Sequence, residues 1–436
     1  MPRVALHTLG CKLNHAETAA IGRQFLEKGF DLVEFGEQAD VCVINTCTVT
    51  ERADRECRQV IRRALRSSAD PYVIVTGCYA QLEPEEIAAI EGVDLVLGSQ
   101  EKFQVFQHLE SLAGEPTPRV CVSEPDDSWG FGPGYSGSES GHTRAYLKVQ
   151  DGCDYTCSFC TIPLARGVSR SQPLEECLLQ ARHLVEAGHK EIVLTGVNVG
   201  DYGRKAGEDL LRLVREMVRV EGLRRLRLSS IEPNLLSDEL IDLVASSGVL
   251  CRHFHIPLQS GEDTILRRMR RRYTAAAYAG TIARIRKQIP ACGIGVDVIV
   301  GFPGETEAQF EETYRFLNEL PVSYLHVFTY SERPNTPASE AAFQVEPRVR
   351  QERNRRLRIL SQKKRHAFYE SMVGQSLPVL TESDVEGDLR SGFADNYVRV
   401  GLPAAGLEEN EIRSARIVSV EGDLCRGTLV DPVSVA

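Results

Sequence analysis

Short apolar runs alternate with amphipathic stretches along most of the chain, and this alternation predicts its fold class. In the first 110 or so residues four such runs are separated by stretches with helical spacing. They are Val4–Leu9, Val41–Asn45, Tyr72–Thr76 and Val93–Leu97. Strand-like runs that alternate with helical stretches are typical of βαβ units. We therefore expect an N-terminal α/β domain with a parallel sheet over residues 1–111.

The middle of the chain repeats this alternation six times. The six runs are Ala145–Val149, Glu191–Thr195, Leu226–Ser229, His253–Pro257, Gly295–Val300 and Tyr324–Thr329. Six consecutive βα units predict a partial (β/α)6 barrel over residues 144–370. The preceding residues 112–143 are rich in Gly, Pro, Ser and acidic side chains, and we interpret them as a linker or mobile loop.

The pattern changes in residues 371–436. Short alternating runs separated by glycine occur at Ser376–Leu380, Tyr397–Val400 and Ile412–Val418. They predict a small antiparallel β-barrel of the size of an OB fold. The expected class is thus α/β, with an N-terminal parallel sheet, a central partial barrel and a small C-terminal barrel.

Composition places the chain among ordinary globular proteins. Of its 436 residues, 42% are hydrophobic and 26% are charged. No apolar run approaches the roughly 18 residues that span a membrane, and the N-terminus lacks a signal-peptide pattern. We expect a cytoplasmic protein without a membrane partner. In a reducing compartment, thirteen cysteines point to metal ligands or catalytic groups rather than disulfides.

Cys153, Cys157 and Cys160 form a Cys-x3-Cys-x2-Cys loop directly after the first run of the predicted barrel. Loops at this end of the strands hold the active sites of parallel barrels. Most [4Fe–4S] clusters take four Cys ligands, so a three-Cys loop leaves one iron open to another ligand. The other interpretation is a zinc loop that is completed by a distant fourth ligand.

Cys11, Cys47 and Cys78 are far apart in sequence, but each directly follows an apolar run. The carboxyl ends of parallel strands lie along one edge of a sheet, so we expect these thiols to converge there. They are interpreted either as ligands of a second cluster or as buried structural cysteines. We interpret the seven other cysteines as packing residues: Cys42, Cys57, Cys121, Cys177, Cys251, Cys292 and Cys425.

The loop Gln150–Cys160 closely resembles the cluster loop of the radical S-adenosylmethionine (SAM) superfamily. Over essentially its whole length, the chain resembles the methylthiotransferases of that superfamily, and its tail resembles the RNA-binding TRAM barrel. The matching segments are Leu9–Asn14, Asn45–Thr50, Gly77–Gln81, Leu194–Gly196, Ser229–Pro233, Ile256–Gly261, Asp297–Glu305, Gly374–Gln375 and Asn396–Val400.

The resemblance implies SAM and two [4Fe–4S] clusters as cofactors. The cluster on the middle cysteines would cleave SAM to a 5′-deoxyadenosyl radical, which abstracts hydrogen from C2 of the adenine at tRNA position 37. The cluster on the N-terminal cysteines would supply a methylated sulfur. An unactivated C–H bond is beyond side-chain acid–base chemistry, so a cofactor must carry the step. No catalytic residue is expected beyond the cluster ligands.

Three branches of this family differ in substrate: isopentenyl-adenosine in tRNA, threonylcarbamoyl-adenosine in tRNA, and an aspartate of a ribosomal protein. The segments around Cys11 and Cys47 look most like the bacterial N6-threonylcarbamoyladenosine(37)-C2 branch. The implied partners are the anticodon loop of ANN-reading tRNAs and an electron donor such as a flavodoxin or ferredoxin. The context of Lys12 and the Asn-Tyr pair of the tail count against a protein substrate.

Residues at the strand ends of the barrel are the expected SAM contacts, because active sites of such barrels lie there. By resemblance, Phe159 lies near the adenine of SAM, and Gly196 permits close backbone approach. Turn residues also occupy such positions for structural reasons. The expected set is Phe159, Thr195, Gly196, Ser229, Ser230, Glu232, Gln259, Gly301 and Pro303.

Two basic runs are candidates for phosphate contacts, although the net charge of the whole chain is −10. Residues 267–272 are dense in arginine, and residues 348–365 contain nine Lys or Arg and one acid. Such runs give salt-dependent RNA binding, but they are more often solvated helix faces. The residues expected to bind RNA are Arg267, Arg268, Arg270, Arg271 and Arg399.

A function from a different class is a zinc-stabilised RNA-binding protein without catalysis. Zinc sites are colourless, whereas iron–sulfur proteins are brown and absorb broadly in the visible range. The colour of the purified protein therefore separates this alternative from the radical enzyme.

Overall fold

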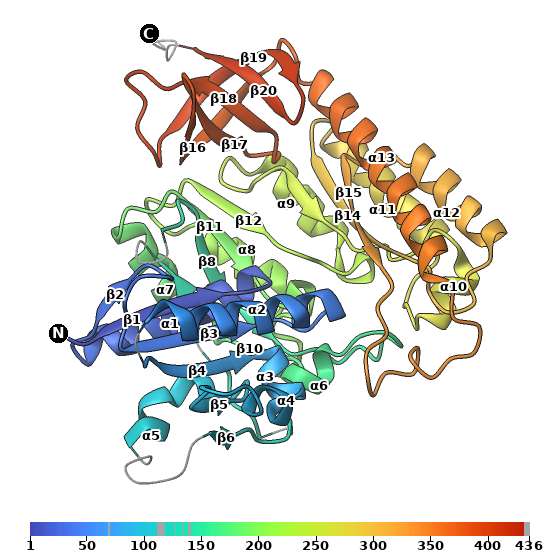
Figure 1. Cartoon of the computed structure of the whole chain (residues 1–436). Coiled ribbons are helices and arrows are strands. Elements are labelled where there is room, and N and C mark those ends of the chain that lie inside the picture. Colours follow the sequence, from blue (N-terminus) through green and yellow to red (C-terminus); the bar gives the residue numbers. More distant parts are fainter. Residues whose placement is uncertain (69, 111–117, 127, 133, 138–140, 431–436) are drawn as a thin grey trace.

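The computed structural model describes residues 1–68, 70–110, 118–126, 128–132, 134–137 and 141–430, and these form three packed parts (Figure 1). A six-stranded parallel sheet with its helices forms the N-terminal part. Six parallel strands curve into the middle part, and a closed five-stranded barrel forms the C-terminal part. This arrangement confirms the predicted α/β fold class.

The N-terminal sheet has the strand order β2-β1-β3-β4-β5-β6, with every neighbouring pair parallel. Its strands are β1 (Arg3–Thr8), β2 (Asp31–Val33), β3 (Val41–Thr46), β4 (Tyr72–Gly77), β5 (Leu95–Leu97) and β6 (Arg119–Cys121). The connecting helices are α1 (Lys12–Glu27), α2 (Glu51–Ser67), α3 (Cys78–Leu82), α4 (Pro84–Ala88) and α5 (Val105–Glu110). All six residues of β3 are buried, because helices cover both faces of a parallel sheet.

All six predicted barrel strands form. They are β8 (Ala145–Lys148), β11 (Glu191–Thr195), β12 (Arg225–Leu228), β13 (His253–His255), β14 (Gly293–Val300) and β15 (Tyr324–Thr329). Isolated bridges from Leu226 to Leu250 and from Ser230 to His255 join the two halves of this curved sheet. The helices on its outside are α7 (Leu174–Glu186), α8 (Leu210–Met217), α9 (Asp238–Ser246), α11 (Ala275–Gln288) and α12 (Glu307–Glu319).

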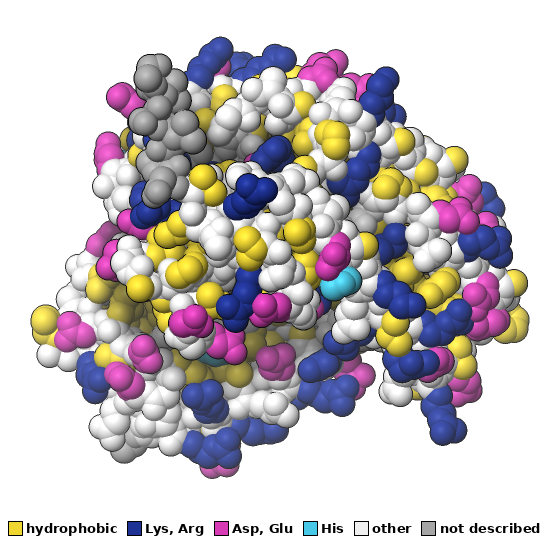
Figure 2. All heavy atoms as spheres, turned by 90° about the horizontal axis from the view of Figure 1, so that it is seen from above, with side chains coloured by type: hydrophobic (Ala, Val, Ile, Leu, Met, Phe, Trp, Pro, Cys, Tyr) yellow, Lys and Arg dark blue, Asp and Glu magenta, His cyan; other side chains and the backbone are white. Residues whose placement is uncertain are grey.

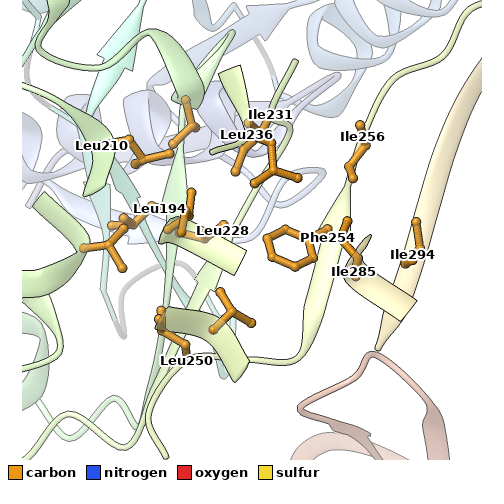
Figure 3. Packing of buried hydrophobic residues seen from close by; sticks show 14 of the residues in the cluster. Leu194, Leu210, Leu228, Ile231, Leu236, Leu250, Phe254, Ile256, Ile285 and Ile294 are labelled. Carbon is orange, nitrogen blue, oxygen red and sulfur yellow. The ribbon is translucent and has the colours of Figure 1, made fainter. Parts of the chain in front are cut away.

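One continuous core holds these helices against the strands (Figure 3). Leu194, Leu228 and Phe254 of the strands belong to one buried cluster with Leu210 of α8 and Ile285 of α11, and none is more than 4% exposed. Burying one such side chain stabilises the fold by about 1.5–3 kcal/mol. Because apolar packing fixes the outer face, the inner face of the barrel is left for polar groups.

The predicted linker, residues 112–143, contributes strands to both neighbouring parts. Strand β6 extends the N-terminal sheet, and β7 (Tyr135–Ser136) pairs antiparallel with β8. Neither strand was predicted, because two- and three-residue strands between Gly- and Pro-rich segments leave no periodic pattern. Residues 111–117, 127, 133 and 138–140 of this region lie outside the described residues.

The long helix α13 (Pro347–Glu370) runs along the barrel and leads to the C-terminal part (Figure 1). That part consists of β16 (Ser376–Glu386), β17 (Leu389–Ala394), β18 (Arg399–Pro403), β19 (Ile412–Glu421) and β20 (Leu424–Leu429). The sequence pattern had indicated only three of these strands. In the part of the chain described, no helix is both long enough and apolar enough to cross a membrane.

The turn between β17 and β18 closes the end of the large barrel at which the strands begin. Tyr397 of this turn stacks on His253, the first residue of β13, with ring centroids 4.6 Å apart. Arg227 of β12 donates hydrogen bonds to the carbonyl oxygens of Asp395 (3.0 Å) and Ala394 (3.3 Å). The C-terminal barrel is therefore fixed to the large barrel by buried polar contacts.

Candidate functional site

Cys11, Cys47 and Cys78 lie at the carboxyl edge of three adjacent parallel strands, β1, β3 and β4. The three thiols are neighbours: burial raises the pKa of Cys47 to about 12, and Cys78 and Cys11 both add to that shift. All described cysteines are free thiols. Of the seven that were interpreted as packing residues, six are buried and one is partly exposed.

Two glycines allow the chain to bring these thiols together. Gly10 has φ of +97°, and a Cβ at this position would lie 2.6 Å from Cβ of Cys47. Gly77 has φ of +99°, and a Cβ there would lie 2.4 Å from the carbonyl oxygen of Thr46. Any other residue would therefore be strained and would also collide with its neighbour. Glycine at these two positions therefore lets the loops before Cys11 and Cys78 pass close to Cys47 and Thr46.

Space for a bound group lies beside these thiols. A pocket of about 460 Å³ is lined by His7, Thr8, Leu9, Gly10, His15, Cys47, Val49, Ala53 and Glu56. Cys11 has exposed surface, although the surrounding protein raises the pKa of its thiol. Three free thiols at one edge of a sheet form a donor set that suits an iron–sulfur cluster.

Cys153, Cys157 and Cys160 lie on the loop before α6 (Ile162–Arg166), and each is partly exposed. The loop is held by hydrogen bonds from the Cys153 amide to the carbonyl oxygen of Gly167 (3.0 Å) and from the Cys160 amide to that of Cys157 (3.2 Å). Burial raises the pKa of Cys153 and Cys160 to about 12. A bound metal would have to displace these protons, as metals do from thiol ligands.

Three side chains that follow successive barrel strands carry buried polar atoms with no hydrogen-bond partner among the described residues. They are Asn198 after β11, Ser229 after β12 and Gln259 after β13. A buried polar atom without a partner costs about 1–3 kcal/mol. The arrangement therefore fits a polar ligand that supplies the missing hydrogen bonds, and the amino, carboxylate and ribose groups of SAM are of this kind.

Asn198 was not among the predicted residues. It lies only two residues after Gly196, in the segment that leaves β11, so the strand-end argument used for Thr195 and Gly196 could have included it. Both polar atoms of its side-chain amide lack a partner in the described chain, and its side chain is buried. Its backbone amide donates to Oε1 of Gln150 at 2.8 Å, which holds the residue in place.

Arg271 was predicted to bind RNA, and the structure contradicts this prediction because the side chain is buried. Its side chain is 3% exposed, donates a hydrogen bond to Sγ of Cys157 at 3.1 Å and forms an ion pair with the carboxylate of Glu232. The chain turns after α10 (Asp263–Arg268), with Arg270 at φ of +58°, and this turn directs Arg271 inward. A buried guanidinium cannot reach an RNA phosphate.

The other predicted cofactor residues lie around the same end of the barrel. Phe159 is half-buried and packs against the cluster that contains Met269. A Cβ at Gly196 would lie 2.9 Å from Oε1 of Gln150, so the backbone passes close there. Ser230 is bridged to His255. Thr195, Gly301 and Pro303 are buried, and Gly301, with φ of +74°, lies against Arg350 of α13 rather than beside a cysteine.

Arg166 connects the two groups of cysteines. It ends α6, six residues after Cys160, and its Nε lies 3.3 Å from Sγ of Cys78. The same guanidinium donates to Glu17 (2.9 and 3.0 Å), Asp151 (3.0 Å) and the side-chain oxygen of Asn14 (2.6 Å). No sequence pattern indicated this contact, because its partners come from distant parts of the chain.

Glu17 is the centre of a fully buried charge cluster. Its carboxylate also accepts hydrogen bonds from Lys102 (2.6 Å) and Lys148 (2.8 Å), and none of the three side chains is exposed. Burial alone would raise the pKa of Glu17, but Arg166, Lys102 and Lys148 hold it well below its usual range. The cluster joins the N-terminal sheet to the barrel at the position of the cysteines.

The arginines predicted to bind RNA are divided by the fold. Arg267, Arg268 and Arg270 are exposed on α10 and the turn after it, whereas Arg399 lies on β18 of the C-terminal barrel. The basic run of α13 is used largely within the protein. Arg350 is paired with Glu332 and Arg353 with Glu305. On the face shown in Figure 2, Lys/Arg and Asp/Glu side chains are interspersed.

Comparisons with known proteins agree with this architecture. The family model of the Radical SAM superfamily matches residues 147–317, and that of the uncharacterized protein family UPF0004 matches residues 3–98. The structure of the radical S-adenosylmethionine methyltransferase TsrM from Kitasatospora setae, with cobalamin and a [4Fe-4S] cluster bound, superposes with a TM-score of 0.57. It is 17% identical and covers 94% of this chain and 84% of that one. At this identity the likeness concerns the fold.

Curated relatives match almost end to end. "Threonylcarbamoyladenosine tRNA methylthiotransferase MtaB" of Bacillus subtilis is 44% identical, over 97% of this chain and 98% of the relative. The protein of the same name from Thermotoga maritima is 36% identical, over 99% and 98%. "tRNA-2-methylthio-N(6)-dimethylallyladenosine synthase" of Ruegeria pomeroyi is 33% identical, over 98% and 99%.

Proposed function

The chain belongs to the radical SAM tRNA methylthiotransferases, and on that basis we propose that it methylthiolates C2 of N6-threonylcarbamoyladenosine at position 37 of tRNA. The product is 2-methylthio-N6-threonylcarbamoyladenosine. The observation that carries this choice is the 44% identity to the Bacillus subtilis relative named for threonylcarbamoyladenosine, against 33% to the Ruegeria pomeroyi relative named for dimethylallyladenosine. Membership in an enzyme family sets aside a zinc-stabilised protein without catalysis.

The family uses SAM and a [4Fe–4S] cluster, for which the proposed ligands are Cys153, Cys157 and Cys160. A second cluster is proposed on the three N-terminal cysteines. When bound, the two clusters supply reductive cleavage of SAM and the sulfur that is transferred. The proposed SAM contacts are Asn198 together with Phe159, Thr195, Gly196, Ser229, Ser230, Glu232, Gln259, Gly301 and Pro303.

The chain's own residues contribute position and charge. Arg271, fixed by Glu232, directs a positive charge at Sγ of Cys157. Arg166 directs another at Sγ of Cys78. Hydrogen bonds from charged donors to a ligand sulfur stabilise the negative thiolate that metal binding requires. Holding both groups of thiols around one base also replaces a bimolecular encounter by a fixed geometry.

The proposed partner is the anticodon loop of ANN-reading tRNAs, contacted through the exposed Arg267, Arg268 and Arg270 and through Arg399 of the small barrel. A flavodoxin or ferredoxin is proposed as the electron donor, and the cytoplasm as the location. Isopentenyladenosine-37 of tRNA is the second candidate substrate, because the Ruegeria pomeroyi relative is named for that class of nucleoside. A ribosomal-protein aspartate is a further alternative.

Two measurements test this proposal. Anaerobically reconstituted protein is expected to hold about eight irons, falling to about four in a Cys153/Cys157/Cys160→Ala variant. The matched control replaces three packing cysteines, Cys42, Cys251 and Cys425, and is expected to keep its iron. Mass spectrometry of nucleosides then compares tRNAs that carry threonylcarbamoyl- or isopentenyl-adenosine at position 37. Methylthiolation of the isopentenyl nucleoside alone would assign the enzyme to the other branch.

A further inference from the structure

Lys12 places a positive charge between the N-terminal sheet and the interior of the barrel. It is the first residue of α1 and directly follows Cys11. In the part of the chain that the structure describes, its ammonium group has neither an ion-pair nor a hydrogen-bond partner. Burial lowers the pKa of His253 and His326, and the charge of Lys12 lowers both further, as it also lowers the pKa of Tyr397. This charge therefore acts inside the barrel.

The wall that faces this charge is polar and partly open. His255, Asp297 and His326 come from the adjacent strands β13, β14 and β15, with Asp297 opposite His326 in the register. Nε2 of His255 lies 2.9 Å from Oδ1 of Asp297, and the two imidazole rings lie 5.4 Å apart. His255 and Asp297 are 18% and 23% exposed, and His326 is exposed. These three side chains therefore line an accessible space and are not part of a hydrophobic core.

The charges around this space do not balance. Arg225 and Arg227 share one acid, Glu191, at 3.3 and 2.7 Å, and Arg144 is paired with Glu382 at 3.0 Å. Three arginines thus share two carboxylates, although Arg225 and Arg227 also donate to backbone carbonyl oxygens of the C-terminal barrel. Lys12 adds a further positive charge. Asp297 is already paired with His255. A partly open site with surplus positive charge favours an anionic ligand, because a partly buried charge without a partner is costly.

The position of Lys12 next to Cys11 indicates which part of a bound substrate Lys12 would contact. C2 and C6 of adenine are both bonded to N1, so a substituent on N6 begins near the carbon that receives the sulfur. Lys12 adjoins Cys11, one of the ligands proposed to hold the sulfur-donating cluster. The N6 substituent of a base held there therefore lies in the neighbourhood of Lys12. A threonylcarbamoyl group ends in a carboxylate, whereas an isopentenyl group is a hydrocarbon.

We propose that Lys12, together with His326, binds the carboxylate of the threonylcarbamoyl group and thereby selects this nucleoside over the isopentenyl one. The inference rests on the proposed function and names the residues that determine its specificity. An isopentenyl group would leave the Lys12 ammonium without a counterion, and a site built to pair with a charged group discriminates strongly against an analogue that lacks it.

The test measures binding of anticodon stem-loop RNAs that differ only at position 37, by fluorescence anisotropy with the reconstituted protein. The three RNAs carry threonylcarbamoyladenosine, its methyl ester and isopentenyladenosine. Wild type is expected to bind the acid about tenfold or more tightly than the ester, as for the loss of one charge-assisted hydrogen bond. Lys12→Met is expected to bind the two alike, and Lys12→Arg to keep the preference. His326→Phe is expected to reduce it.

Controls separate specificity from folding. Lys287→Met removes an exposed lysine of α11 and is expected to leave the acid-to-ester ratio unchanged. Iron content and the thermal midpoint of Lys12→Met show whether the variant is folded. Equal binding of acid and ester by wild type, or an undiminished preference in Lys12→Met, overturns the inference about Lys12. Methylthiolation of the threonylcarbamoyl RNA by wild type would still support the proposed function in that case. Methylthiolation of the isopentenyl RNA alone overturns both.

The three wall residues also place their ligand atoms within 4.8 Å of one another, which is close enough for one metal ion. Metal analysis of wild type and His326→Phe settles this point. Equal metal content in the two proteins supports the role of His326 in binding the carboxylate. A metal other than the cluster iron that is lost in His326→Phe would overturn that role.

Discussion

Nε of Arg166 lies 3.3 Å from Sγ of Cys78, so a helix that follows one group of cysteines contacts a thiol of the other group. The guanidinium is 2% exposed and is oriented by Glu17 and Asp151. One side chain therefore links the helix after the Cys153 loop to a thiol of the N-terminal group. Because the guanidinium is planar and offers donors in fixed directions, lysine cannot reproduce all of these contacts.

Replacing Arg166 is expected to destabilise the protein and to impair the N-terminal cysteine site. In Arg166→Met, Glu17 and Asp151 each lose a buried partner, and breaking a buried ion pair in this way costs about 3–5 kcal/mol. Denaturant unfolding measures the loss of stability, and iron counting measures the loss of iron. Arg55→Met, which removes an exposed arginine of α2, is the control. Wild-type stability in Arg166→Met would contradict the role assigned to this residue.

Gly10→Ala is expected to separate the N-terminal thiols without touching the Cys153 loop. The new methyl group would lie 2.6 Å from Cβ of Cys47, and the backbone would hold alanine at a positive φ, which costs about 1–3 kcal/mol. Reconstituted protein should lose about four irons and keep about four. Gly29→Ala, also at positive φ but with open space around its Cβ, separates strain from collision. If both variants keep all their iron, close packing at Gly10 is not required.

The arginines near α10 are expected to differ in what they bind. Replacing Arg267, Arg268 and Arg270 by alanine should weaken tRNA binding and reduce the slope of log affinity against log salt by about 2, because three phosphate contacts are lost. Arg271→Met should leave that slope unchanged but weaken SAM binding, since Glu232 and Cys157 lose their shared partner. Equilibrium binding at several salt concentrations and SAM titration distinguish the two. A reduced slope in Arg271→Met would restore the sequence-based assignment to RNA.

His253 is expected to make the stability of the protein depend on pH. Burial, with the nearby charge of Arg227, lowers its pKa well below the ordinary value of 6.5. The unfolded chain therefore binds a proton more readily than the folded one, so the stabilising effect is present above about pH 6.5 and is lost as the pH falls. The expected slope is up to about 1.4 kcal/mol per pH unit.

Thermal midpoints from pH 5 to 8 check this expectation. His253→Phe keeps a ring to stack on Tyr397 but cannot be protonated, so its stability should fall less steeply in acid than that of wild type. His366→Gln, at an exposed position on α13, is the matched control and should retain the wild-type slope. Parallel curves for wild type and His253→Phe would exclude His253 as the source of the acid sensitivity.

Local sequence patterns were sufficient for the main strands and for the placement of the cysteines. Alternating apolar runs identified every strand of the large barrel. Cys11, Cys47 and Cys78 converge because each directly follows a parallel strand, and Gly10 and Gly77 permit their close approach. Strands β2, β6, β7, β17 and β20 were missed, as were the two-residue strands β9 (Gln150–Asp151) and β10 (Arg170–Ser171), because short edge strands and small barrel strands carry little periodic signal.

Only the tertiary structure shows which arginines of a basic run are exposed and which are buried or paired within the protein. Arg270 is exposed and Arg271 is buried, because a single turn at positive φ reverses the direction of the side chain. Likewise, the basic run of α13 looks suited to RNA in sequence, yet Arg350 and Arg353 are paired with Glu332 and Glu305 of the same chain. The residue type alone therefore does not predict which group a charged side chain pairs with.

The sequence by itself determined the order of βα units, the small terminal barrel and the two groups of three cysteines, since each follows from local periodicity or from the rule that parallel strands end at one edge. Only the tertiary structure decided that Arg166 joins these groups, that Tyr397 closes the barrel and that Lys12 has no counterion among the described residues. Those features depend on burial and on contacts between residues 88 or more positions apart, which no local pattern records.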